Sequence, residues 1–109
     1  MTESMESNDK IHNEIKVIVR TYIPDAQVLL FGSRARNEES PDSDYDILIV
    51  TEESFSSERG ISLRTKIRKD LLMKGYRTDV LLQSKSDVER KRRLPGHIIR
   101  NILKEAIIL

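Results

Sequence analysis

Residues 29–50 read LLFGSRARNEESPDSDYDILIV, and this stretch predicts the centre of the fold. One apolar run ends at Gly32-Ser33, and a second begins directly after Asp46. We interpret the stretch as a strand, a turn with a short helix, a loop and a second strand. Apolar and β-branched residues on both faces of residues 46–50 indicate that the second strand lies in the middle of a sheet.

Two carboxylates stand at the start of the predicted second strand. Because successive side chains of a strand point to opposite faces, Asp44 and Asp46 should share one face while Tyr45 points to the other. Two like charges at this spacing are costly unless a cation lies between them, and carboxylate oxygens suit Mg²⁺ or Mn²⁺. This end of the strand therefore predicts a metal site.

The Gly-Ser turn supplies a second kind of binding group. Gly32 has no side chain to keep a ligand away from the backbone. The amides of Ser33 and Arg34 would form an anion-binding nest if they open a helix. A phosphate site beside a metal site indicates that the chain binds a nucleoside triphosphate.

The composition limits what such a site can belong to. The 109 residues suffice for a single domain, residues 1–109, with one modest core. Lysine and arginine number 19 against 18 acidic residues, so the net charge is +1 and no general affinity for nucleic acid or membrane follows. No cysteine is present, which excludes disulfides and thiolate chemistry. The start of the chain has no signal-sequence pattern and no apolar run approaches the ~20 residues that span a bilayer, so we expect a cytoplasmic protein.

Periodicity, caps and breakers predict four further helices and a third strand. The helices run from a cap at Ser7 or Asn8 to Pro24, from Ser56 or Ser57 to Lys74 with Gly75 as the C-terminal cap, from a capping box of Ser86 and Glu89 to Pro95, and from about residue 98 onwards. The second helix should bury Ile61, Leu63, Ile67, Leu71 and Leu72, and the last should bury Ile98, Ile99, Ile102, Leu103 and Ala106. The third strand covers residues 76–82 and includes Asp79, and the apolar tail 107–109 should pack on the core or on a second chain. The fold class is α/β (α+β), a small mixed β-sheet with helices packed on it.

These residues, taken in order, resemble the minimal nucleotidyltransferases of the DNA polymerase β-like nucleotidyltransferase superfamily. The family pattern is Gly-Ser-x-Ala-Arg-Gly, a loop, Ser-Asp-x-Asp before an apolar strand, and a third aspartate on a following strand. Residues 32–37 read GSRARN, residues 43–46 read SDYD and residues 78–80 read TDV. Asn37 stands where the family usually has Gly, and Asn tolerates the left-handed backbone of such a turn. Ala106 stands where relatives often carry Gly after Glu.

The resemblance implies a catalytic role for three aspartates. Asp44 and Asp46 would hold the metal ions, Mg²⁺ or Mn²⁺, and Asp79 would complete the second metal site and act as general base. The alternative is that Asp44 and Asp79 are turn or cap residues and Asp46 is a charge at a strand edge. A carboxylate that leads directly into a buried strand needs a partner, which favours the metal site.

The resemblance also implies a triphosphate site. Gly32 and Ser33 would bind the β- and γ-phosphates, and Arg34 and Arg36 would neutralise the pyrophosphate that leaves. Ser33 could instead be a helix cap, and the two arginines could be solvated surface charges.

The expected function is that of a Mg²⁺-dependent nucleotidyltransferase that moves AMP from ATP to a hydroxyl of another macromolecule. Resemblance to the minimal branch implies pairing with a small helical HEPN-type protein in a toxin–antitoxin module, with this chain as the antitoxin. The rival hypothesis is a non-catalytic binding module that occludes its partner, although a pure binder has no use for a cluster of like charges. The acceptor, the preferred base and association with a second copy of the chain stay open.

Other charged groups carry less weight. The basic run of residues 90–93 indicates a solvated helix face, because no aromatic residues are interleaved with it. His12 and His97 have no neighbouring ligand pattern, so we expect both to be surface residues.

Overall fold

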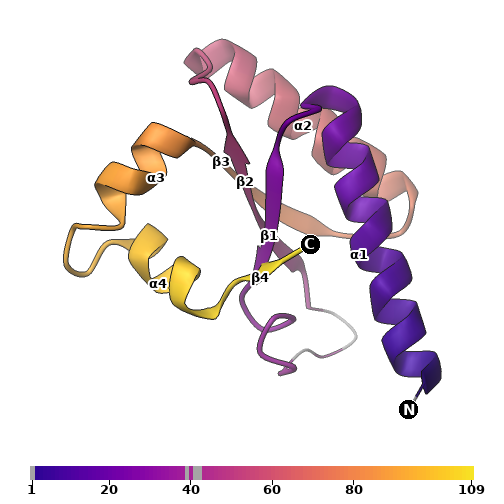
Figure 1. Cartoon of the computed structure of the whole chain (residues 1–109). Coiled ribbons are helices and arrows are strands. Elements are labelled where there is room, and N and C mark those ends of the chain that lie inside the picture. The colour runs from indigo at the N-terminus through magenta and orange to yellow at the C-terminus, as the bar shows by residue number, and fades with distance from the viewer. Residues whose placement is uncertain (1, 39, 41–42) are drawn as a thin grey trace.

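The computed structural model describes residues 2–38, 40 and 43–109. In these residues four helices pack on the two faces of a four-stranded mixed sheet (Figure 1). The elements in chain order are α1 (Thr2–Tyr22), β1 (Gln27–Phe31), β2 (Tyr45–Thr51), α2 (Ser57–Met73), β3 (Thr78–Ser84), α3 (Lys85–Lys91), α4 (Ile98–Glu105) and β4 (Ile107–Ile108). The predicted fold class is therefore confirmed. None of the helices in these ranges is long and apolar enough to cross a membrane.

The sheet has the strand order β3-β2-β1-β4. β2 runs parallel to β3 and antiparallel to β1, and β4 pairs antiparallel with β1. Because β1 and β2 are antiparallel, the end of β1 meets the starts of β2 and β3 at one end of the sheet. The residues of the predicted site come from these three strand ends.

Two apolar clusters explain why β2 is apolar on both faces. One cluster packs α1 and α2 against the face that carries Val28, Leu30, Ile47 and Ile49. The other packs Ile99 and Ile102 of α4 against Leu29, Leu48 and Val50 on the opposite face. Figure 1 shows α1 and α2 on one side of the strands and α3 and α4 on the other. The prediction that β2 is a buried central strand is confirmed.

The buried stripe of α2 is narrower than predicted. Leu63, Ile67 and Leu71 are buried, whereas Ile61 is 55% exposed and Leu72 is 58% exposed. Residues two apart on a helix lie about 200° apart around its axis, and adjacent residues about 100° apart. Ile61 and Leu72 therefore cannot share the buried face, and their predicted burial is wrong.

Element boundaries also differ from the predictions. α1 begins at Thr2, before the expected caps, and α3 is capped by the hydroxyl of Ser84, which accepts a hydrogen bond from the N–H of Asp87. The predicted capping box at Ser86 is therefore wrong. β3 starts two residues after the predicted start at Tyr76, because Tyr76 still donates its N–H to the carbonyl of Leu71 at the end of α2. Ser56 caps α2 as predicted, and Gly75 follows it with φ +94°.

The C-terminal segment returns to the sheet. Ala106 adopts an extended conformation and leads into β4, so its predicted place in the last helix is wrong. Ile98 is exposed rather than buried, whereas Ile99 and Ile102 are buried as expected. Leu109 donates its N–H to the carbonyl of Val28 at 2.9 Å and packs on the core, whereas Ile107 is 41% exposed and Ile108 is 65% exposed. The predicted packing of the apolar tail on the core is therefore confirmed for Leu109 alone. The predicted loop of residues 36–41 lies partly outside the described residues, which omit 39 and 41.

Candidate functional site

Three aspartates lie together where β2 and β3 begin. Asp46 is opposite Asp79 in the parallel register, and opposite Phe31 in the antiparallel register. Neighbouring strands are about 4.8 Å apart, and residues opposite each other on parallel strands point to the same face. Asp44 precedes β2 by one residue, and its charge acts on Asp46. The structure thus brings the three selected aspartates to one end of the sheet.

Alternation along β2 places Asp46 away from the α1–α2 core. Tyr45 is buried in that core together with Ile47, as the sequence pattern predicts. Asp46 therefore points to the opposite face, where Leu48 and Val50 farther along the strand are covered by α4. The Asp46 carboxylate lies at the open end of the face that α4 partly covers.

The electrostatics at Asp46 favour a cation. Burial, followed by the negative charges of Asp79 and Asp44, raises the pKa of the Asp46 carboxyl above its ordinary value, and the positive charge of Arg36 opposes this shift. A bound divalent cation would remove the repulsion between these carboxylates. The carboxylates of Asp44, Asp46 and Asp79 therefore repel one another when no cation is bound.

The aspartates supply only part of a metal coordination shell. The side chain of Asp44 is 52% exposed, and its Oδ1 lies 3.5 Å from Nε of Arg77. Within the ranges that the structure describes, no three His, Cys, Asp or Glu side chains are close enough to enclose a metal ion. Mg²⁺ commonly takes one or two carboxylates and completes its shell with phosphate and water oxygens. Asp44 and Asp46, with Asp79 beside them, have the chemistry for such a site.

The turn after β1 brings the backbone into contact with Asp46. Gly32 has φ +77°, and a Cβ atom at this position would lie 2.0 Å from Oδ2 of Asp46. Only glycine permits this approach, because a methyl group would occupy the place of the carboxylate. The predicted role of Gly32 as a point of close backbone approach has this geometric basis, although its neighbour in the structure is the carboxylate.

The segment after Gly32 is a turn, and the predicted short helix is wrong. The N–H groups of Ala35 and Arg36 both donate to the carbonyl of Gly32, at 3.1 and 3.2 Å. Asn37 then adopts φ 58°, which prevents a helix from continuing and uses the tolerance expected of Asn. Among the described residues, no acceptor faces the backbone N–H groups of Ser33 and Arg34. These two amides are therefore available to an anion.

Arg34 holds the loop and lies away from the carboxylates. Its Nε and Nη2 donate to the carbonyl of Ser43 at 3.1 and 2.9 Å, and its guanidinium stacks 4.1 Å from the centre of the Tyr45 ring. Tyr45 and Asp46 are on opposite faces of β2, so the guanidinium of Arg34 is on the face opposite Asp46. These contacts give Arg34 a structural role in the loop before β2.

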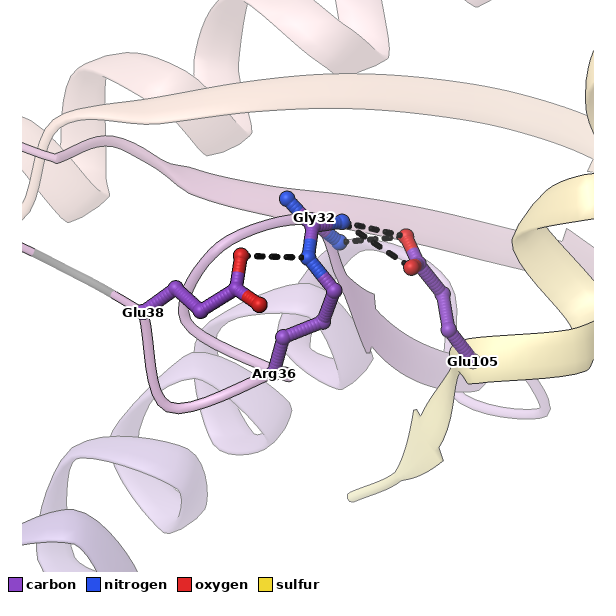
Figure 2. Close-up of polar contacts among 4 residues, drawn as sticks. All are labelled: Gly32, Arg36, Glu38 and Glu105. Carbon is purple, nitrogen blue, oxygen red and sulfur yellow. Dashed lines mark hydrogen bonds and ion pairs between the residues drawn. The ribbon is translucent and has the colours of Figure 1, made fainter.

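Arg36 is held between two glutamates beside the Gly32 turn (Figure 2). Its Nη1 donates to both carboxylate oxygens of Glu105, at 3.1 and 2.9 Å, and its Nε donates to Glu38 at 3.0 Å. Oε1 of Glu105 also accepts the N–H of Gly32 at 3.1 Å. Glu105, the last residue of α4, therefore joins the C-terminal helix to the turn of the predicted phosphate site.

The nucleotidyltransferase domain family matches residues 12–109 of the chain. The chain belongs to this family. The match includes the Gly-Ser turn and the three aspartates of this nucleotidyltransferase domain. A search of curated protein sequences found no match.

Three solved structures share the fold of this nucleotidyltransferase domain. One is a chain of a toxin–antitoxin complex with AMP-PNP, with a TM-score of 0.58 and 19% identity over 89% of this chain and 70% of that one. A second is from the complex of tri-AMPylated Shewanella oneidensis HEPN toxin with MNT antitoxin, with a TM-score of 0.55 and 17% identity over 92% and 69%. A third, assigned as a nucleotidyltransferase from Sulfolobus solfataricus, has a TM-score of 0.51 and 22% identity over 91% and 76%. The expected resemblance to minimal nucleotidyltransferases is thereby confirmed at the level of family and fold.

Glu105 is a site residue that the sequence motifs do not predict. One signal was present, because a glutamate in the last turn of a helix is disfavoured by the helix dipole. A residue that stays there against this preference often has a partner elsewhere. Its contact with Gly32 spans 73 positions of the sequence, so pattern and spacing alone do not reveal it.

We expect Gly32→Ala to destabilise this nucleotidyltransferase domain more than Gly96→Ala. Gly96 has φ +75°, nearly that of Gly32, but a Cβ there would meet nothing within 4 Å. The control should cost about 1–2 kcal/mol for the left-handed backbone. Gly32→Ala should cost about 3 kcal/mol or more, because the methyl group must also displace Asp46. Urea unfolding measures both variants, and equal losses would show that the contact with Asp46 is not tight.

The Glu105 contacts predict a pH dependence of stability. Bonds from Arg36 and from the N–H of Gly32 lower the pKa of the Glu105 carboxyl. The contribution of Glu105 is therefore fully present above its ordinary value of 4.5 and is lost as the pH falls through the lowered pKa. We expect the difference in Tm between the wild type and Glu105→Gln to shrink between about pH 5 and about pH 3, in a series measured at steps of about one pH unit.

A second glutamate provides the control for this pH series. Glu53 is exposed, and its carboxylate makes no ion pair or hydrogen bond within the described part of the chain. Glu53→Gln should follow the wild-type Tm at every pH. A difference between the wild type and Glu105→Gln that stays constant down to the lowest pH would contradict the assigned carboxylate bonds.

Proposed function

We propose that this nucleotidyltransferase domain transfers AMP from ATP, with Mg²⁺ or Mn²⁺ bound, to a hydroxyl of another macromolecule. The observation that carries the proposal is the close approach of the Gly32 turn to Asp46, which lies opposite Asp79 in the sheet. A backbone that can accept phosphate therefore adjoins carboxylates that can hold a cation. Nucleotidyl transfer needs these two groups next to each other.

The residues of the phosphate side would act through the backbone and one guanidinium. The triphosphate would approach the backbone of the Gly32 turn, and the N–H groups of Ser33 and Arg34 would donate to its β- and γ-phosphate oxygens. Arg36 lies beside this turn and would neutralise part of the charge on the leaving pyrophosphate. The side chain of Arg34 keeps the loop in place through Ser43 and Tyr45.

The aspartates would hold the cation and receive the proton. Asp44 and Asp46 would bind the cation of the triphosphate, and Asp79 would complete a second position. A divalent cation supplies neutralisation of phosphate charge and a lower pKa for the attacking hydroxyl. Asp79 would accept the proton of that hydroxyl as its oxygen bonds to the α-phosphorus of ATP. The bond from this phosphorus to the α–β bridging oxygen breaks, and pyrophosphate leaves.

We further propose that the domain is an antitoxin that acts on a HEPN-type partner protein in the cytoplasm. The support is the shared fold with chains of two toxin–antitoxin complexes, one of which contains an AMPylated HEPN toxin.

One observation favours the rival function of a non-catalytic binding module. Glu105 already accepts the N–H of Gly32 and pairs with Arg36, so two groups assigned to phosphate are engaged with a carboxylate. A triphosphate would have to displace Glu105 or bind beside it. A module that only occludes its partner would not need this exchange.

A labelled-nucleotide experiment tests the proposal. The protein is incubated with Mg²⁺, a co-expressed HEPN-type partner and ATP labelled on either the α- or the γ-phosphate. We expect label on the partner only from α-labelled ATP, because AMP is transferred and pyrophosphate is released. Transfer of γ-label would indicate phosphorylation, and no transfer of either label would favour the binding module.

A further inference from the structure

A groove runs between α2 and β3 and reaches Asp44 and Asp79. Its first part has a volume of about 400 Å³ and is lined by Asp44, Thr65, Arg68, Lys69, Leu72, Arg77 and Thr78. Its second part has a volume of about 250 Å³ and is lined by Ile61, Arg64, Thr65, Arg68, Asp79, Val80 and Leu81. The two parts share Thr65 and Arg68, so they adjoin each other. A molecule that lies in this groove therefore reaches both Asp44 and Asp79.

The cations that α2 places in the groove have no partners within the described chain. Within residues 2–38, 40 and 43–109, the side chains of Arg64, Arg68 and Lys69 make no ion pair or hydrogen bond. The basic run at the end of α3 differs, because Arg90 pairs with Asp87, and Arg92 and Arg93, which follow the helix, pair with Glu89. Asp70, the acid nearest in sequence, accepts a hydrogen bond from Tyr22 of α1. The groove lining therefore keeps an excess of positive charge, even when Asp44 and Asp79 are counted against its cations.

A buried hydroxyl at the groove also lacks a partner. Thr78 is 7% exposed and lines the groove, and its Oγ1 has no hydrogen-bond partner in the described part of the chain. Most buried hydroxyls in folded proteins are hydrogen-bonded. β3 is moreover an edge strand of the sheet, so its outer backbone groups face no other strand among the described residues. A bound extended chain could supply the missing polar groups.

The chemistry of the groove favours a protein over a nucleic acid. Neither part of its lining contains an aromatic side chain, on which the bases of a single strand would stack. Exposed Ile61 and Leu72 lie among the cations and offer apolar contacts at both ends. Alternating apolar and cationic groups suit a polypeptide with acidic and apolar side chains.

We propose that this groove binds an extended acidic segment of a partner protein and presents a hydroxyl side chain of that segment to Asp79. The assignment of the segment as an acceptor rests on the proposed transferase function, whereas the binding of an acidic segment does not. Arg64, Arg68 and Lys69 would pair with its carboxylates. The position of the groove at the start of β3 would place the segment beside Asp44 and Asp79.

The test uses a fluorescein-labelled peptide of eight glutamates around one central tyrosine, with the same peptide containing lysines as its counterpart. Fluorescence anisotropy with the full chain measures binding without ATP. We expect the acidic peptide to bind and the basic peptide not to bind. Arg64→Glu combined with Arg68→Glu should weaken binding by about 10-fold or more, the scale of losing two close charge pairs. Lys69→Glu alone, at an exposed position, should weaken it by a smaller factor.

The matched control is Arg92→Glu combined with Arg93→Glu, which makes the same change of net charge in the turn that follows α3. Circular dichroism verifies that each variant is folded. Equal loss in the control and in the groove variant, or no binding of the acidic peptide to the wild type, would overturn the proposal. Tighter binding of a twelve-nucleotide oligothymidine that is lost in the same groove variant would also overturn it, because the groove would then be a nucleic-acid site.

Addition of Mg²⁺ and α-labelled ATP separates this inference from the proposed function. Groove-dependent peptide binding without transfer of label would support the groove and contradict the transferase. Transfer to the tyrosine that is equally fast in the groove variant would support the transferase and contradict the groove. Transfer that falls in proportion to peptide binding would support both.

Discussion

Asp46→Asn is expected to abolish the stabilisation of this protein by ATP with Mg²⁺, while the protein without nucleotide becomes more stable to heat. The pKa of the Asp46 carboxyl is raised by burial and by the charges of Asp79 and Asp44. Between its ordinary value of 3.8 and the raised value, the folded state binds more protons than the unfolded state. Stability therefore falls as the pH rises through this window, and the charged carboxylate is destabilising at neutral pH. The neutral amide removes that repulsion together with the metal ligand.

Differential scanning fluorimetry measures both effects in one series. The wild type should gain Tm with ATP and Mg²⁺, because the ligands bind only the folded state, and Asp46→Asn should not. The double variant of Asp44→Asn and Asp46→Asn should also show no shift, and nucleotidyl transfer should fall about 10³-fold or more. Asp25→Asn, at an exposed position away from the site, is the control. A ligand-induced shift that persists in the double variant would place the metal elsewhere.

Asp79→Asn is expected to separate nucleotide binding from chemistry. ATP should still bind through Asp44, Asp46 and the Gly32 turn, because Asp79 makes no hydrogen bond or ion pair that organises the described residues around it. Transfer should fall by about 10²-fold or more, which is the usual contribution of a general base. The thermal shift with ATP reports binding, and transfer of α-labelled AMP reports chemistry.

The same variant distinguishes the two functions. If the chain neutralises its partner by modification, Asp79→Asn should lose partner suppression together with transfer. If it acts by occlusion, the variant should suppress the partner fully, because its contact surface is unchanged. Full suppression without transfer in both the wild type and the variant would exclude the enzyme hypothesis.

The central strands and helices could be predicted from the sequence, because the patterns that specify them involve residues only a few positions apart. The apolar run before Gly32 and the one after Asp46 became β1 and β2, and β2 is buried on both faces as predicted. Gly75 and Asn37 have the left-handed backbone that their residue types favour. The prediction of a short helix after Gly32 was wrong, because two backbone N–H groups donate to the Gly32 carbonyl and the chain then turns. The predicted burial of Ile61 and Leu72 was wrong, because apolar character alone does not define the side of a helix that faces the sheet.

The sequence by itself determined the family motif, the strand that carries Asp46, and the three aspartates and the Gly-Ser turn as candidate site residues. These features depend on neighbours within a few positions, so spacing reveals them. The tertiary structure alone decided that Gly32 touches Asp46, that Arg34 holds the loop on the other face, and that Glu105 pairs with Arg36. It also decided that the cations of α2 line a groove with β3. Each of these contacts joins residues from separate elements or across a strand register, and only the packing of the sheet and helices brings them together.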